Sequence, residues 1–105
     1  MEQKRQAIET GEGIDWATGE ALAFGSLLLE GHRVRLSGED VQRGTFSHRH
    51  AVLIDQANQA EYTPLNNIRE GQAKIEAFNS LLAEFGVLGF DYGYSLADPK
   101  TMVLW

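Results

Sequence analysis

The chain has 105 residues, of which 43% are hydrophobic and 23% charged, values that fit one soluble globular domain and leave no room for a second core. Its formal net charge of −6 argues against a nucleic-acid binder, because contacts with phosphates need a basic surface. The lack of cysteine excludes disulfides and thiolate zinc sites, and no apolar run approaches the ~20 residues of a membrane span.

The first third of the chain predicts two helices. Residues 1–13 are polar and contain two closing glycines, so they predict a short solvated helix or a tail that leads into the domain. Residues 16–30 repeat apolar side chains at helical spacing. Asp15 is placed as the N-cap of this second helix, and Gly31 as its C-terminal stop.

The remainder predicts strands, loops and one more long helix. Residues 32–36 alternate as a strand does, and residues 46–56 predict an irregular turn followed by a short apolar strand. Residues 61–68 predict an extended stretch around Pro64. A long helix follows, with Asn79 or Ser80 as its cap and Pro99 beyond its end, and residues 101–105 predict a continuous apolar strand.

Helix, strand, loops, helix and strand in this order predict an α/β fold with a parallel sheet flanked by helices. In such a sheet the loops at the C-terminal ends of the strands carry the chemistry. Because the chain ends on an apolar strand at Trp105, we expect it to be truncated.

Glu84 is the first candidate site residue, since it lies in the first turn of the predicted helix among apolar side chains: Leu81, Leu82, Phe85, Val87 and Leu88. Burial would take water from the carboxylate, whereas the helix dipole would favour its anion. These opposed effects hold a carboxylate ready to share a proton. The alternative is a cap or an ion-pair partner.

Three glycines of the same helix fall in one narrow sector: Gly86, Gly89 and Gly93. Glycine is unfavourable inside a helix, so this sector indicates that something packs closely against the backbone. A neighbouring helix or the sheet is one candidate, and a ligand is the other.

The polar loop over residues 37–50 is the second candidate site, and it carries His48 and His50 two positions apart. In an extended segment the two imidazoles would share a face and, with an arginine, could donate to an anionic substrate such as a carboxylate. A His-x-His metal pair is a weaker interpretation, because no third ligand of usual spacing is near. Histidines that only shape the loop remain a further alternative. The chain has no glycine-rich phosphate loop and no nucleophile elbow.

Three stretches of the sequence resemble a known family: DWATGEALAFGSLLLEGHRVRLSGEDVQRGTFSHRHAVL, YTPLNNI and FNSLLAEFGVLGFDYGYSLADPKTMVLW. They are similar to the thiamine-diphosphate-dependent decarboxylating component of 2-oxoglutarate dehydrogenase complexes, over nearly the whole chain from Asp15 to Trp105. The resemblance implies that residues 14–105 are the N-terminal part of a transketolase-like pyrimidine-binding domain, truncated at its C-terminus. Residues 1–13 would be a tail or linker.

The resemblance also implies roles for the candidate residues. Glu84 would hydrogen-bond the aminopyrimidine ring nitrogen of thiamine diphosphate and share a proton with it, as both a cofactor-binding and a catalytic residue. His48 and His50 would be the imidazoles on the substrate side. Asp91 departs from the family pattern, which usually has glutamate there, and the shorter side chain is expected to weaken a contact.

Further partners follow from the resemblance alone. The diphosphate and magnesium would be held by a different domain, the cofactor would lie between the subunits of a homodimer, and the acyl group from 2-oxoglutarate would pass to a lipoyl-bearing succinyltransferase. The enzyme would be located in the cytoplasm of a bacterium or in the mitochondrial matrix of a eukaryote. The fragment alone is expected to be inactive. Alternatives are a 2-oxoadipate dehydrogenase, a 2-oxo acid decarboxylase, and a noncatalytic interaction module or inactive gene fragment.

Overall fold

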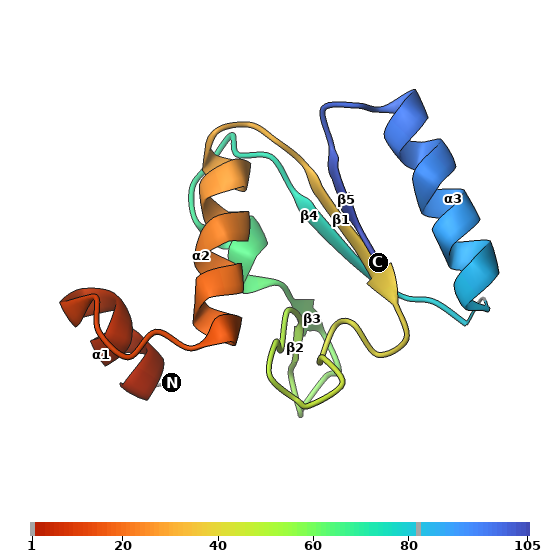
Figure 1. The fold of residues 1–105 in the computed structure, drawn as a ribbon. Coiled ribbons are helices and arrows are strands. Elements are labelled where there is room, and N and C mark those ends of the chain that lie inside the picture. The colour runs from red at the N-terminus through yellow and green to blue at the C-terminus, as the bar shows by residue number, and fades with distance from the viewer. Residues whose placement is uncertain (1, 82) are drawn as a thin grey trace.

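The computed structural model describes residues 2–81 and 83–105, and Figure 1 traces their path. Leu82, which the sequence placed beside Glu84, lies outside the described residues. The helices are α1 (Glu2–Thr10), α2 (Trp16–Leu29), the short 3-10 helix η1 (Pro64–Asn67) and α3 (Glu84–Ala97). The strands are β1 (Val34–Gly38), β2 (Leu53–Ile54), β3 (Glu61–Tyr62), β4 (Ile75–Asn79) and β5 (Met102–Leu104).

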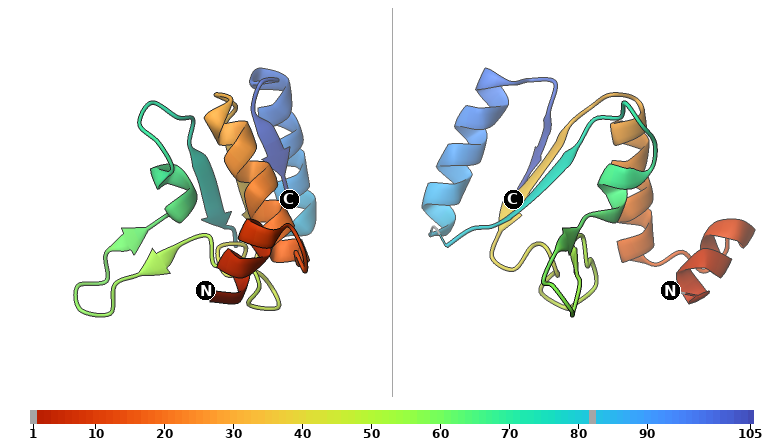
Figure 2. Two further views of the ribbon diagram at one scale, coloured as in Figure 1. Left: turned by 90° about the vertical axis from the view of Figure 1, so that its left-hand side faces the viewer. Right: turned by 180° about the vertical axis from the view of Figure 1, so that it is seen from behind.

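The main sheet has the strand order β4-β1-β5, and both pairings are parallel. In the central strand, Val34 lies opposite Ile75 on one side and Met102 on the other. Helices α2 and α3 cover opposite faces of this sheet (Figures 1 and 2). β2 and β3 form a separate antiparallel hairpin. The predicted α/β fold with a parallel sheet flanked by helices is therefore confirmed.

The hydrophobic core lies between α2 and the sheet. Its buried members are Phe24, Leu28, Val34, Leu36 and Ile75, and Leu28 has no exposed surface. Successive strand residues point to opposite faces, so Val34 and Leu36 face α2, whereas Arg35 and Ser37 face α3. The alternation in the predicted strand thus separates an apolar face from a polar one.

Helix α2 begins and ends as the sequence predicts. The Asp15 side chain accepts a hydrogen bond from the Thr18 backbone N–H at 2.8 Å, which satisfies one of the free donors of the first turn. Gly31, just beyond the helix, has a φ of 91°, a left-handed conformation that costs glycine little.

The long helix begins later than predicted. Residues 75–79 form β4, and α3 starts at Glu84, so Asn79 and Ser80 are not its caps. Asn79 ends a strand because it pairs with Gly38 of β1, and its side-chain amide bonds Gln42 instead of a helix N-terminus. The helix ends at Ala97, with Pro99 beyond it as expected.

The other segments match the predictions in part. α1 is the short N-terminal helix, and Gly11 and Gly13 beyond it both have positive φ. The short apolar strand after the histidine loop is β2. The stretch around Pro64 is extended only as far as β3, because Pro64 opens a 3-10 helix, where its missing N–H is not needed.

No helix in the described part of the chain is long and apolar enough to cross a membrane.

We expect Leu28→Ala to lower the free energy of unfolding by about 2–5 kcal/mol, because it removes a fully buried side chain and leaves a cavity. Leu22→Ala on the same helix is the matched control, since Leu22 is 43% exposed and should cost much less. Denaturant unfolding of both variants measures the difference. Equal losses would contradict the location of the core.

The Thr18 hydroxyl and then the Thr18 backbone N–H hold the pKa of the Asp15 carboxyl below its usual value. The stability that this cap contributes is therefore present above about pH 4 and is lost as the pH falls through the lower pKa of the folded state. We expect the difference in unfolding midpoint between the wild type and Asp15→Asn to shrink over that acid range. A difference that does not change with pH would contradict the lowered pKa.

Candidate functional site

The candidate site lies at the C-terminal edge of the parallel sheet, where β1 runs into the histidine loop and β4 runs toward α3 (Figure 1). The two connections are joined directly. The Ser80 backbone N–H donates to the Gly38 carbonyl at 2.9 Å, and the Gln42 side-chain amide donates to the Ala77 carbonyl at 2.8 Å. Hydrogen bonds near the strand ends therefore join the loop that carries the histidines to the segment that leads to Glu84.

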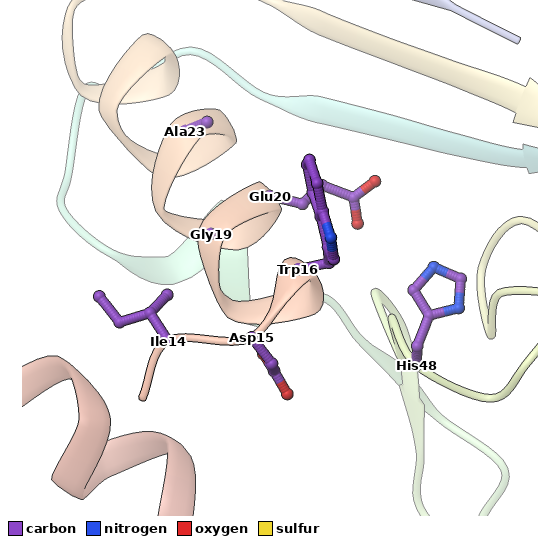
Figure 3. Close-up of a pocket in the computed structure, with 7 residues that line it drawn as sticks. All are labelled: Ile14, Asp15, Trp16, Gly19, Glu20, Ala23 and His48. Carbon is purple, nitrogen blue, oxygen red and sulfur yellow. The ribbon is translucent and has the colours of Figure 1, made fainter. Parts of the chain in front are cut away.

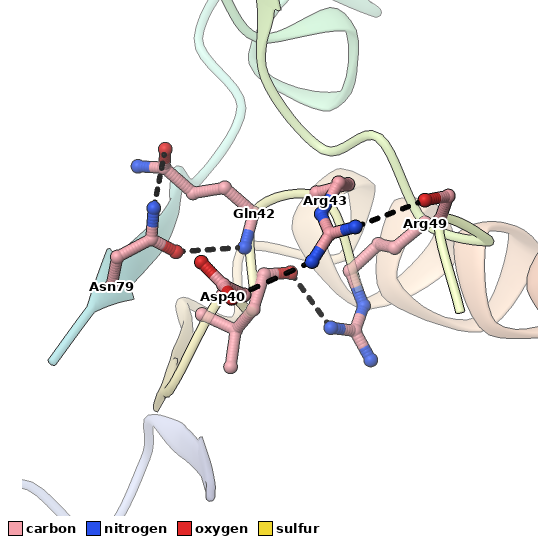
Figure 4. Close-up of polar contacts among 7 residues, drawn as sticks. Asp40, Gln42, Arg43, Arg49 and Asn79 are labelled. Carbon is pink, nitrogen blue, oxygen red and sulfur yellow. Dashed lines mark hydrogen bonds and ion pairs between the residues drawn. The ribbon is translucent and has the colours of Figure 1, made fainter. Parts of the chain in front are cut away.

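Polar side chains also shape the histidine loop from within (Figure 4). The Asn79 side-chain oxygen accepts from the Gln42 backbone N–H at 3.1 Å, and Arg43 reaches Asp40 at 3.5 Å. Arg49 donates to the Val41 carbonyl at 2.7 Å. These bonds close the loop into a compact turn.

Arg49 also ties this turn to α2. Its guanidinium donates two hydrogen bonds to the Glu20 carboxylate, at 2.9 and 2.8 Å. Both side chains are mostly buried, with 17% of Arg49 and 27% of Glu20 exposed. A two-point contact of this kind fixes orientation as well as distance. It sets the place of the residues on either side of Arg49, which are His48 and His50.

His48 packs against Gly44, where any side chain would meet the imidazole: a Cβ at Gly44 would lie 2.5 Å from His48 Cε1. Gly44 also has a φ of 86°, so the position favours glycine twice over. The buried Nδ1 of His48 has no hydrogen-bond partner among the described residues. The ring lines a cavity of about 640 Å³ together with the exposed indole of Trp16 and with Asp15 and Glu20 (Figure 3).

His50 is exposed and has a φ of 45°, and Ser47 is also left-handed at 54°. The prediction that the two histidines share a face of an extended segment is therefore wrong, because the backbone of residues 44–50 turns back on Arg43, whose carbonyl accepts from the Arg49 and His50 N–H groups. His48 and His50 nevertheless line one cavity of about 440 Å³.

Glu84 is the first residue of α3, as its predicted place in the first turn requires. Its surroundings differ from the expectation. The carboxylate is exposed, and so are Leu81 (102%) and Phe85 (91%). Leu81 and Phe85 do not bury Glu84, because their own side chains are exposed, and Val87 is the buried apolar residue of this helix. Glu84 does not line the cavities that contain the histidines.

The glycine sector of α3 likewise faces open space. A Cβ added at Gly89 or at Gly93 would meet no atom within 4 Å. The predicted close packing against this sector is therefore not made by the described part of the chain.

Sequence reasoning missed the polar contact that joins α3 to the sheet. Asp91 is 5% exposed and accepts hydrogen bonds from Arg35 at 2.5 Å and from the Ser37 hydroxyl at 2.7 Å, both on β1. The expectation that aspartate makes a weaker contact here than glutamate would stays a prediction, because these distances describe the aspartate alone. The available signal was Arg35 itself, because a charge in a strand covered on both faces needs a partner.

A family model described as "Transketolase, pyrimidine binding domain" matches residues 12–105. The chain belongs to this family. The transketolase pyrimidine-binding family assignment confirms the resemblance seen in the sequence, and it accounts for the parallel sheet.

Proteins named "2-oxoglutarate dehydrogenase E1 component" from Brucella ovis and Brucella canis are each 63% identical to the chain over all 105 of its residues. The protein of that name from Brucella melitensis biotype 2 is 62% identical over the same length. The chain spans only 10% of these relatives.

We expect Glu20→Gln to lower the free energy of unfolding by about 1–3 kcal/mol, because it leaves the partly buried Arg49 without its carboxylate. Glu9→Gln is the control, since the Arg5–Glu9 pair is exposed and should contribute less than about 1 kcal/mol. Amide hydrogen exchange over residues 43–51 should also accelerate in Glu20→Gln alone. Unchanged exchange there would contradict the role of the pair in holding the histidine loop.

Proposed function

We propose that this chain is the pyrimidine-binding part of a 2-oxoglutarate dehydrogenase decarboxylating component, with Glu84 as the residue that contacts the pyrimidine ring of thiamine diphosphate. The identity of 63% to Brucella proteins of that name carries the proposal. Family membership supports the cofactor, because the matching domain is named for pyrimidine binding. The substrate would be 2-oxoglutarate.

The residues at the strand ends fit such a cofactor. Glu84 offers an exposed carboxylate, which can accept a hydrogen bond from a protonated ring nitrogen, and Phe85 beside it offers an exposed aromatic surface. The first turn of α3 has no side-chain cap. Backbone N–H donors at an uncapped helix start are open to water or to a ligand.

The division of labour would be as follows. Thiamine diphosphate, when bound, supplies the carbon nucleophile that attacks the 2-keto carbon before carbon dioxide leaves. Glu84 would hold the proton at the ring nitrogen and orient the ring. His48 and His50 would donate to the substrate carboxylates, a role favoured by the cavity that both residues line.

The remaining parts would lie outside this chain. We assign magnesium and the diphosphate to another domain, as the family resemblance implies. We assign residues 1–13 to a linker and residues 14–105 to the N-terminal part of the pyrimidine-binding domain. A lipoyl-bearing succinyltransferase would accept the acyl group. The relatives are bacterial, which favours the cytoplasm.

A homodimer is part of the same proposal, with the cofactor between the subunits. It is supported by the uncovered apolar side chains of α3, of which Phe85, Leu88, Tyr92 and Leu96 are each more than half exposed. Gly89 and Gly93 lie in open space, where another backbone could approach closely.

The test is Glu84→Gln in the full-length enzyme that contains this segment. We expect turnover of 2-oxoglutarate to fall about 10²–10⁴-fold, because the amide cannot take the proton. Glu70→Gln, at an exposed turn, is the control and should keep near wild-type turnover. Circular dichroism and the melting temperature should be the same for both variants. A folded Glu84→Gln enzyme with retained turnover would contradict the proposed role of Glu84 in contacting the pyrimidine ring.

A further inference from the structure

The contact between α3 and the sheet depends on a buried charge. Val87 and Asp91 are 3% and 5% exposed, whereas Leu88 and Leu96 on the same helix are 55% and 66% exposed. Apolar burial alone therefore does little to fix how α3 sits on the sheet. Asp91 stands out because a buried carboxylate has strict geometric needs, unlike an apolar side chain that slides at little cost.

Both carboxylate oxygens of Asp91 are engaged. Arg35 Nη1 donates to Oδ1 at 2.5 Å, and the Ser37 hydroxyl donates to Oδ2 at 2.7 Å. Arg35 also donates to the Ser37 hydroxyl at 3.3 Å, which closes the three side chains into one cluster. Arg35 and Ser37 are alternate residues of β1, so they reach the helix from two points along the central strand.

Aromatic rings enclose the arginine. Its guanidinium carbon lies 5.1 Å from the centre of the Phe78 ring on β4, and 4.9 Å from each of the Phe90 and Tyr94 rings on α3. The Arg35 side chain is 12% exposed and that of Asp91 is 6% exposed. Restricted access of water strengthens the pair and makes its loss costly.

This cluster bears directly on Glu84. Glu84 and Asp91 lie seven positions apart in one uninterrupted helix. At the rise and twist of an α-helix they are about 10 Å apart along the axis and within about 20° of one another around it. A rotation or slide of α3 that Asp91 forbids would move Glu84 by a similar amount.

We propose that Asp91 is a positioning residue, and that its contacts with Arg35 and Ser37 fix the rotation and axial setting of α3 and thereby the place of Glu84 at the sheet edge. The inference rests on the proposed function, in which Glu84 contacts the pyrimidine ring of the cofactor. A misplacement of about 1 Å in such a contact costs on the order of 100-fold in rate.

The experiment is a mutant cycle in the full-length enzyme. Arg35→Met combined with Asp91→Leu replaces the ion pair by apolar side chains, a change that usually preserves or raises stability. We expect the melting temperature to hold while kcat falls about 10- to 100-fold. In a Glu84→Gln background the same pair of substitutions should cost less than about twofold, because Asp91 would act through Glu84.

Two single variants complete the test. Asp91→Glu keeps the charge and should retain most of the activity, whereas Asp98→Asn, at the far end of α3, should leave kcat near wild type. Asp98 is an aspartate at the C-cap of α3 that accepts a hydrogen bond from the Thr101 hydroxyl, which makes it a matched control for Asp91. If the apolar pair fails to fold, Ser37→Ala removes one bond to Asp91 and should give a smaller loss that also disappears in the Glu84→Gln background.

The outcomes distinguish the proposed function of Glu84 from the positioning role of Asp91. Retained turnover in Glu84→Gln would overturn the proposed function. A large loss in Glu84→Gln, together with an Asp91 effect that is absent or equally large in both backgrounds, would leave that function standing and overturn the positioning role.

Discussion

The central strand β1 imposes the constraint on which the rest of the structure depends. Both of its edges are paired, by β4 and β5, and both of its faces are covered, by α2 and α3 (Figure 1). Val34 and Leu36 face α2 and are 1% and 5% exposed. Arg35 and Ser37 face α3. One five-residue strand therefore demands an apolar partner on one side and a charged partner on the other.

The two helices contact the two faces of β1 through different kinds of interaction. Helix α2 supplies Phe24 and Leu28, and its contact with the sheet is a close-packed apolar core without directional bonds. Helix α3 supplies Asp91, whose contact is directional. The helix that carries Glu84 is thus fixed on the sheet more by the directional hydrogen bonds of Asp91 than by buried apolar area.

The sequence predicted the elements in which local signals agree. The cap Asp15, the apolar period and the stop Gly31 all specify the same helix, and the alternation around Arg35 specifies β1. β4 was missed because no strand signal was recognised over residues 75–78, and because Asn79, its last residue, is a good helix cap by type. Strand pairing with β1 overrides that preference, since it satisfies a whole edge of backbone groups whereas a cap satisfies one.

The candidate site shows the same limit. The position of Glu84 in the first turn follows from its sequence, but its exposure does not, because composition states which residues are apolar and not which way they point. The pairs Arg35–Asp91 and Glu20–Arg49 join residues far apart in the chain, so no local pattern predicts them.

The Glu20–Arg49 and Arg35–Asp91 pairs lie on opposite faces of the sheet. Glu20 and Arg49 hold the histidine loop to α2 on one face, while Arg35 and Asp91 hold α3 on the other. The bond from Ser80 to Gly38 joins the two halves at the strand ends. Apolar contacts could supply the same stability without the same directionality, since two-point hydrogen bonds to a carboxylate fix angles as well as distances. Polar pairs at these positions would thus suit the proposed site, in which side chains from both faces of the sheet would contact one ligand.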